Sequence, residues 1–139
     1  MPIAHRVDHK RRLVVAAAYG TVTAEDLFAY QREVASRPDA AGYDELVDMT
    51  PAAHIAAEES TRARDLASLA ASADQPDVTT RFAIVAPTDL AFGLGRMYQS
   101  YRENERRTTK QVGVFRTMEE ACRFLGVEPP LELPAYPKR

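Results

Sequence analysis

The chain has 139 residues, enough for one domain with a substantial core, and 18 Lys plus Arg against 20 Asp plus Glu give a formal net charge of −2. A small negative net charge excludes a domain that binds nucleic acid through an overall positive charge. No apolar run approaches the roughly 20 residues that a membrane span requires. The single cysteine, Cys122, can form neither an internal disulfide nor a cysteine-rich zinc site. The first residues lack the basic-then-apolar order of a signal peptide, so we expect a cytoplasmic protein.

The predicted elements begin with a β-hairpin. Residues 3–8 and 13–19 are strand candidates separated by the polar turn "HKRR", and Gly20 ends the pair. Thr23 then has the position of a helix N-cap, with Asp26 completing a capping box. The pattern predicts a first helix that runs until the chain reaches Pro38.

The middle of the chain alternates strands with helices. Residues 45–49, "ELVDM", predict a short strand, after which "TPAAHIAAEES" leads into a second helix with Leu66, Leu69 and Ala73 on its inner stripe. Residues 81–86, "RFAIVA", are apolar on both alternating faces, which is typical of a central strand covered by helices on both sides. A third helix is expected to start at Thr88 or Asp89.

The last predicted pair is a strand, "KQVGVFR", and a helix, "TMEEACRFLGV", capped by Thr117 and Glu120 and stopped by Gly126. The order of elements predicts an α/β fold: an opening β-hairpin followed by βα units, forming a mixed, mostly parallel five-stranded sheet with four helices. We expect a single domain over residues 1–127 and a Pro-rich C-terminal tail over residues 128–139, which cannot be helical.

Two glycines, Gly93 and Gly95, lie within the predicted third helix. A dinucleotide-binding loop needs its glycines in the turn between strand and helix, but the turn here is "APTD", and no Gly-Lys-Ser/Thr of a phosphate-binding loop occurs. A glycine inside a helix costs about 1 kcal/mol relative to alanine, so each should have a packing or contact reason. A phosphate cradle is therefore not the explanation.

The helical wheel assigns different reasons to the two glycines. The expected core stripe of this helix consists of Leu90, Leu94, Met97 and Tyr101. Gly93 lies at the edge of that stripe, where it would let the helix pack closely on its neighbour. Gly95 lies on the outer flank beside Phe92 and Arg96, where the three would form a partner or ligand patch.

Four segments in fixed order carry a resemblance to a known family: "GTVTAEDL", "ELVDMT", "RFAIVAPTDLAFGLGRMYQ" and "VGVFRTMEEACRFLG". Up to about Val127 the chain resembles the STAS-like small proteins related to bacterial anti-sigma-factor antagonists, in the SpoIIAA-like or STAS/SEC14-like branch. The resemblance implies no catalytic machinery and a role in binding proteins or small apolar or anionic ligands. Antagonists proper carry a phosphorylatable serine after the strand that here is "ELVDM", whereas this chain has the alanine-rich "AHIAAEES" there.

The candidate site is at the carboxyl ends of the parallel strands, where ligands collect in open α/β sheets and where helix N-termini favour an anion. Eight side chains are predicted there: Asp48, Thr50, His54, Glu59, Arg62, Thr88, Asp89 and Phe92. Purely structural roles are the alternative for several of these. Thr88 and Asp89 would then cap the helix, Glu59 would pair with Arg62, and Asp48 would cap a turn.

Catalytic and metal sites find little support in the sequence. One histidine, His54, with Asp48 and Asp89 is too unspecific for a metal site, and no serine occupies a strand-to-helix turn as a hydrolase requires. We therefore expect a non-enzymatic binding or regulatory domain without cofactor, for a small amphipathic or anionic ligand or for a protein partner. A homodimer is compatible with this expectation. The alternative is a small enzyme or cofactor-dependent protein that uses the same crevice.

Overall fold

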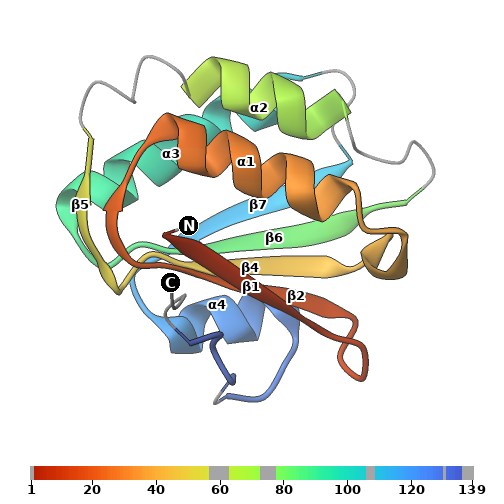
Figure 1. Ribbon diagram of the computed structural model, residues 1–139. Coiled ribbons are helices and arrows are strands. Elements are labelled where there is room, and N and C mark those ends of the chain that lie inside the picture. Colours follow the sequence, from red (N-terminus) through yellow and green to blue (C-terminus); the bar gives the residue numbers. More distant parts are fainter. Residues whose placement is uncertain (1, 57–62, 73–77, 106–108, 130, 136–139) are drawn as a thin grey trace.

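The computed structural model describes residues 2–56, 63–72, 78–105, 109–129 and 131–135. Its main sheet has five strands in the order β1-β2-β4-β6-β7, with β1 antiparallel to β2 and the other pairs parallel (Figure 1). The predicted mixed sheet with an opening hairpin and four helices is confirmed. The elements are β1 (Ile3–Asp8), β2 (Leu13–Ala18), β3 (Gly20–Val22), α1 (Ala24–Ala35), the 3-10 turn η1 (Pro38–Ala40), β4 (Asp44–Asp48), β5 (Ala52–Ile55), α2 (Ala63–Ser72), β6 (Thr80–Val85), α3 (Asp89–Glu103), β7 (Lys110–Phe115) and α4 (Met118–Leu125).

Helices cover both faces of the sheet, three on one side and one on the other. Figure 1 shows α1, α2 and α3 above the strands and α4 below them. The central strand β6 serves both layers, because Phe82 and Ile84 pack in the cluster under the three helices, whereas Ala83 and Val85 pack in the cluster with α4. This burial on both sides explains why the residues on both faces of the strand "RFAIVA" are apolar.

Local capping signals set the helix boundaries as predicted. The Thr23 hydroxyl accepts a hydrogen bond from the Asp26 N–H, and the Asp26 carboxylate accepts one from the Thr23 N–H, which forms the capping box. The Thr117 hydroxyl caps α4 by accepting a hydrogen bond from the Glu120 N–H, and it donates to the Glu120 carboxylate. Gly126 ends α4 with a φ of 73°, a left-handed conformation that glycine adopts without steric cost.

A small two-stranded sheet, β3 paired in parallel with β5, is absent from the sequence prediction. Gly20 was expected to end the hairpin and instead begins β3. Residues 52–55 were expected to lead into a helix and instead form β5, while the described part of α2 starts at Ala63. The prediction was wrong here because a strand of three or four residues has little pattern of its own and depends on its pairing partner.

The inner faces of α2 and α3 also differ from the predicted stripes. Among the described residues of α2 the buried side chains are Ala67, Ala70 and Ala71. The predicted Leu66 and Leu69 are partly buried, and the predicted Ala73 lies outside the described residues. In α3 the buried row is Ala91, Gly95, Tyr98 and Arg102, and the predicted core residue Leu90 is 47% exposed. The buried row of α3 is thus shifted by one residue from the predicted row. Small and polar residues occupy the buried row, and the larger apolar residues lie beside it.

The C-terminal tail packs on the α4 side of the sheet where the structure describes it. Leu131 is buried in the cluster that α4 forms with β2, β4 and β6. The Tyr19 hydroxyl donates to the Pro134 carbonyl at 2.6 Å, and Arg6 Nε donates to the Glu132 carbonyl. The described tail residues therefore lie against the opening hairpin and contribute to the core.

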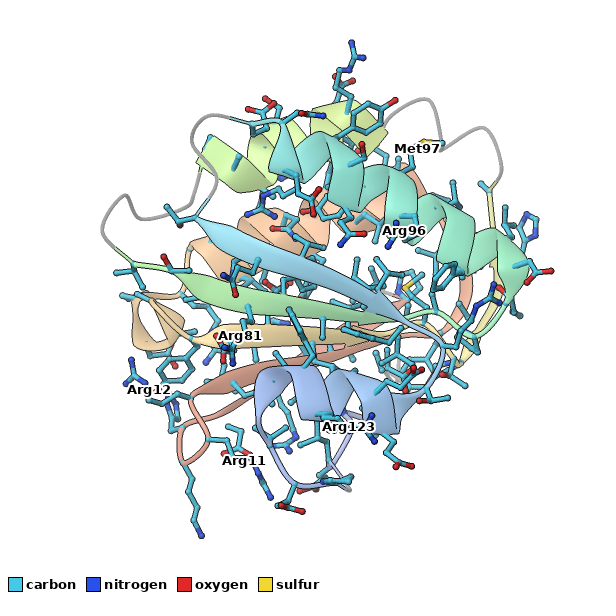
Figure 2. All side chains as sticks on the ribbon, turned by 180° about the vertical axis from the view of Figure 1, so that it is seen from behind. Arg11, Arg12, Arg81, Arg96, Met97 and Arg123 are labelled. Atoms are coloured by element: carbon cyan, nitrogen blue, oxygen red, sulfur yellow. The ribbon has the colours of Figure 1, made fainter. Side chains whose placement is uncertain are left out.

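Exposed arginines gather at the end of the molecule where the hairpin turns. Figure 2 shows Arg11, Arg12 and Arg81 near this end and Arg123 on α4. The cations are not isolated: Arg11 pairs with Asp8 at 2.9 Å, and the Arg12 guanidinium lies 4.8 Å from the centre of the Tyr43 ring. This arrangement is that of a solvated turn with local partners.

Candidate functional site

At the carboxyl ends of the strands, Asp48 has a structural role. Its carboxylate accepts a hydrogen bond of 2.9 Å from the Thr50 N–H, and its residue is 4% exposed. The adjacent Met49 N–H donates to the Val85 carbonyl, which joins the end of β4 to the end of β6. Asp48 therefore closes a turn after β4, as the structural alternative predicted, and Thr50 is exposed beyond it.

The start of α3 uses Thr88 and Asp89 in different ways. Thr88 is the N-cap, with its hydroxyl accepting from the Ala91 N–H at 3.1 Å. The Asp89 side chain is 98% exposed and pairs with Arg116 Nη1 at 2.9 Å. The same guanidinium lies 4.2 Å from the centre of the Phe92 ring, so Arg116 is held between an acid and an aromatic face.

Of the remaining predicted side chains, the two within the described ranges, His54 and Arg96, lie on different elements, β5 and α3. His54 is exposed in β5, opposite Thr21 of β3. Arg96 is exposed on α3, and Figure 2 shows it on the side turned away from α1. Glu59 and Arg62 lie outside the described residues. Within the described ranges no group of three or more His, Cys, Asp or Glu side chains is placed to hold a metal ion.

The prediction for Gly95 was wrong. It was predicted on the outer flank of α3 beside Phe92 and Arg96, but it is buried and faces the sheet. A Cβ built there would lie 2.9 Å from Val114 Cγ1. Gly93, which was expected to permit close packing, is exposed and has open space around it. The two glycines have exchanged the roles that the wheel assigned, since the inner row of α3 is displaced by one residue.

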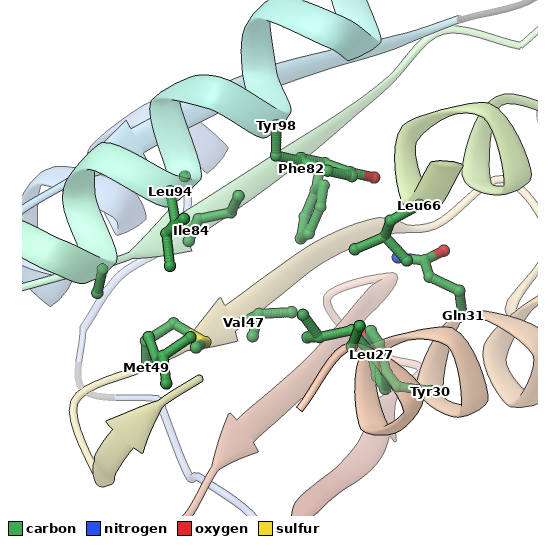
Figure 3. A pocket seen from close by; sticks show the side chains of 14 residues that line it. Leu27, Tyr30, Gln31, Val47, Met49, Leu66, Phe82, Ile84, Leu94 and Tyr98 are labelled. Carbon is green, nitrogen blue, oxygen red and sulfur yellow. The ribbon is translucent and has the colours of Figure 1, made fainter. Parts of the chain in front are cut away.

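An apolar cavity lies between the sheet and the three helices on its upper face. Its volume is about 110 Å³, and its walls come from α1, α2 and α3 together with β4, β5 and β6 (Figure 3). The lining residues are Ala24, Leu27, Tyr30, Gln31, Val47, Met49, Ile55, Leu66, Phe82, Ile84, Ala91, Leu94, Gly95 and Tyr98. Figure 3 shows Met49 at one end and Gln31, Tyr30 and Leu66 at the other.

The two tyrosines of the cavity direct their hydroxyl groups to buried charged partners. The Tyr30 hydroxyl donates to Glu45 Oε2, and Lys110 Nζ lies 3.6 Å from the other oxygen of the same carboxylate. The Tyr98 hydroxyl accepts from Arg102 Nη1 at 2.7 Å. Burial raises the pKa of Tyr30 well above its ordinary value, and the charge of the Glu45 carboxylate is the second-largest cause. Tyr30 is therefore a neutral hydrogen-bond donor at any physiological pH.

A second, polar pocket of about 370 Å³ adjoins the first one. It lies at the amino ends of β4, β6 and β7, beside the C-terminal end of α1, and its walls include Glu45, Lys110 and Arg102. Gln31 lines both pockets. The polar pocket thus lies at the amino ends of the parallel strands, whereas the sequence predicted a site at their carboxyl ends.

Sequence reasoning missed both pockets, although one signal for them was present. "ELVDM" was predicted as a strand of the sheet, and Glu45 is a charged residue within it that is 4% exposed. A buried carboxylate needs hydrogen-bond partners, which come from α1 and β7 and are distant in sequence. An unexplained charge in a buried strand could have pointed to this region.

Comparisons with known proteins support the fold. No family model and no curated protein matches the chain. By structure the chain is similar to an uncharacterized protein from the DUF3478 family with a SpoIIAA-like fold from Shewanella loihica PV-4. The TM-score is 0.55 at 16% identity, over 88% of this chain and 93% of that chain. The chain therefore has the SpoIIAA-like fold that the resemblance predicted, and an identity this low carries the fold alone. In the described part of the chain no helix combines the length and apolar character that crossing a membrane requires.

Proposed function

We propose that this domain binds a small apolar or amphipathic molecule in the cavity under α1, α2 and α3, and that it does no chemistry on that molecule. The observation that carries the proposal is an almost wholly apolar pocket of about 110 Å³ that residues of the main core cluster line. Protein interiors are otherwise close-packed, with few voids larger than a water molecule.

The size of the cavity indicates the size of the ligand. An apolar cavity of roughly 150 Å³ accommodates benzene, whereas pockets for drug-sized molecules span roughly 300–1,000 Å³. A cavity of about 110 Å³ fits one small ring or a short alkyl chain. Larger ligands would need α2 or α3 to move.

The chemistry of the walls favours binding over catalysis. None of the described lining residues carries a carboxylate, imidazole, thiol or amine that could act as a nucleophile or general base. The Tyr30 hydroxyl is committed to Glu45, and the Tyr98 hydroxyl accepts from Arg102. A role as a small enzyme would require reactive groups from elsewhere.

Native mass spectrometry of gently purified protein, followed by thermal-shift titration with toluene and hexane, tests the proposal. We expect either a co-purified small molecule or a rise in Tm with the added probes. Ala91→Leu should fill the cavity from α3 and abolish the shift. Gly93→Ala, on the exposed side of the same helix, should leave it unchanged. If wild type shows no shift with any probe and carries no ligand, the proposal is wrong.

A further inference from the structure

Gln31 lies where the apolar cavity meets the polar pocket. It is on α1, is half-buried, and is the one described residue that lines both. Figure 3 shows its side chain directed toward Leu66 of α2, at the end of the cavity away from Met49. Among the described residues its side-chain amide has no hydrogen-bond partner, whereas the hydroxyls of Tyr30 and Tyr98 are both engaged. Of the described lining residues, Gln31 is thus the one polar side chain that a ligand in the cavity could engage, and it carries no charge.

The charged side chains at the mouth of the polar pocket are paired with one another. Lys110 Nζ lies 3.6 Å from the Glu45 carboxylate, and Arg37 pairs with Asp39 at 2.9 Å. Glu33 is a second acid close enough to act on Arg37. These five groups therefore present neither a cation nor an anion that lacks an opposite charge.

The buried Arg102 also has partners within the fold. It donates to the Tyr98 hydroxyl at 2.7 Å and makes further interactions. A charged head group of either sign would thus find no unbalanced opposite charge among the described groups of this pocket. Moving an ion out of water without a counter-charge is costly, whereas a neutral polar group needs only hydrogen bonds.

We infer that the ligand is a small neutral amphiphile, with its apolar part in the cavity and one carbonyl, hydroxyl or amide group hydrogen-bonded to the Gln31 amide. This inference rests on the proposed function and specifies its ligand class. The Gln31 side chain has an oxygen that accepts and an NH₂ group that donates, so it can pair with any of these groups. An ion would bring a charge that no described group neutralises, and a wholly apolar molecule would leave the amide unused. The cavity volume limits the apolar part to about one ring.

Titrations with benzamide, benzoate and the benzamidinium cation, followed by ligand-observed NMR, test the charge of the ligand. The three probes have nearly the same shape, and their head groups are neutral, negative and positive. Toluene, which has no hydrogen-bonding group, tests the cavity alone and so separates this inference from the proposed function. Wild type should bind benzamide at least about tenfold more tightly than either ion, because burying an ion without a counter-charge is costly.

Gln31→Met removes the amide and nearly preserves the length of the side chain. It should weaken benzamide binding about 2- to 12-fold, the loss expected for a hydrogen bond between neutral groups, and should change toluene binding less than about twofold. Gln31→Leu should give the same result, so the test does not depend on a single replacement.

Gln111→Met is the matched control, because Gln111 is an exposed glutamine of β7 that lines neither pocket. It should bind all four probes as wild type does. If wild type binds toluene but binds benzoate or benzamidinium as tightly as benzamide, or both Gln31 variants bind benzamide as wild type does, the neutral ligand class is overturned and the binding function stands. If wild type binds none of the four probes, both the ligand class and the proposed function fail. Circular dichroism of each variant checks that a loss of binding is not a loss of fold.

Discussion

Gly95→Ala should destabilise the protein, although alanine is the better helix former. The added Cβ would lie 2.9 Å from Val114 Cγ1 and 3.5 Å from Val114 Cγ2, whereas carbon atoms pack best at roughly 3.5–4.0 Å. Val114 is buried near the C-terminal end of β7, and its branched side chain has little freedom to turn. Either Val114 must leave its rotamer or α3 must move away from the sheet.

The magnitude follows from two opposing terms. Replacing glycine by alanine within a helix returns about 1 kcal/mol, and overpacking a core typically costs about 1–3 kcal/mol. The expected net loss for Gly95→Ala is therefore about 0–2 kcal/mol. Gly93→Ala provides the matched comparison, since a methyl group added at this exposed residue would have no atom of a neighbouring element within 4 Å. It should gain up to about 1 kcal/mol.

Urea unfolding followed by circular dichroism measures both variants. With a slope of about 1–3 kcal/mol per molar urea, a difference of 1 kcal/mol moves the midpoint by about 0.3–1 M. Adding Val114→Ala to Gly95→Ala removes both crowded methyl groups, so the double variant should lose less than the sum of the two single changes. If Gly95→Ala is as stable as Gly93→Ala, α3 does not approach β7 as closely as the structure indicates, and the reasoning is refuted.

Three further predictions concern the cap, the buried tyrosine and the tail. Thr23→Ala removes the hydroxyl that accepts from Asp26 N–H and should lower the free energy of unfolding by about 0.5–2 kcal/mol in urea melts; an unchanged midpoint would contradict a capping role. Burial and the Glu45 carboxylate raise the pKa of Tyr30, so above a pH of about 10 the Tyr30 hydroxyl ionises in the unfolded chain but stays protonated in the folded one, and the free energy of unfolding falls. Tyr30→Phe should flatten this alkaline decline in urea melts from about pH 8 to 11, and an unaltered slope would refute the assignment. Leu131→Ala should cost about 2 kcal/mol in the same assay because Leu131 is buried against α4, whereas a change under about 0.5 kcal/mol would show that the tail is not part of the core.

The sequence by itself determined the elements whose signals are local. Thr23 with Asp26 and Gly126 mark helix ends through groups that lie within a few residues of one another. The two-sided apolar run of β6 needs only its own six residues to indicate a strand buried on both faces. From these signals the alternation of strands and helices followed, and with it the mostly parallel sheet.

Only the tertiary structure decided which face of α3 turns inward and where the hollow lies. The row Leu90, Leu94, Met97 and Tyr101 is more apolar than the row Ala91, Gly95, Tyr98 and Arg102, yet the second row is the buried one. Gly95 lets α3 approach Val114 of β7, and Arg102 donates a hydrogen bond to the Tyr98 hydroxyl one turn earlier in α3. A helical wheel cannot predict which row faces the sheet, because it shows no contacts with other elements. The same holds for β5, which exists through its pairing with β3, and for the contact of Tyr30 with Glu45. Each of these depends on residues far apart in the chain, whose proximity the fold creates.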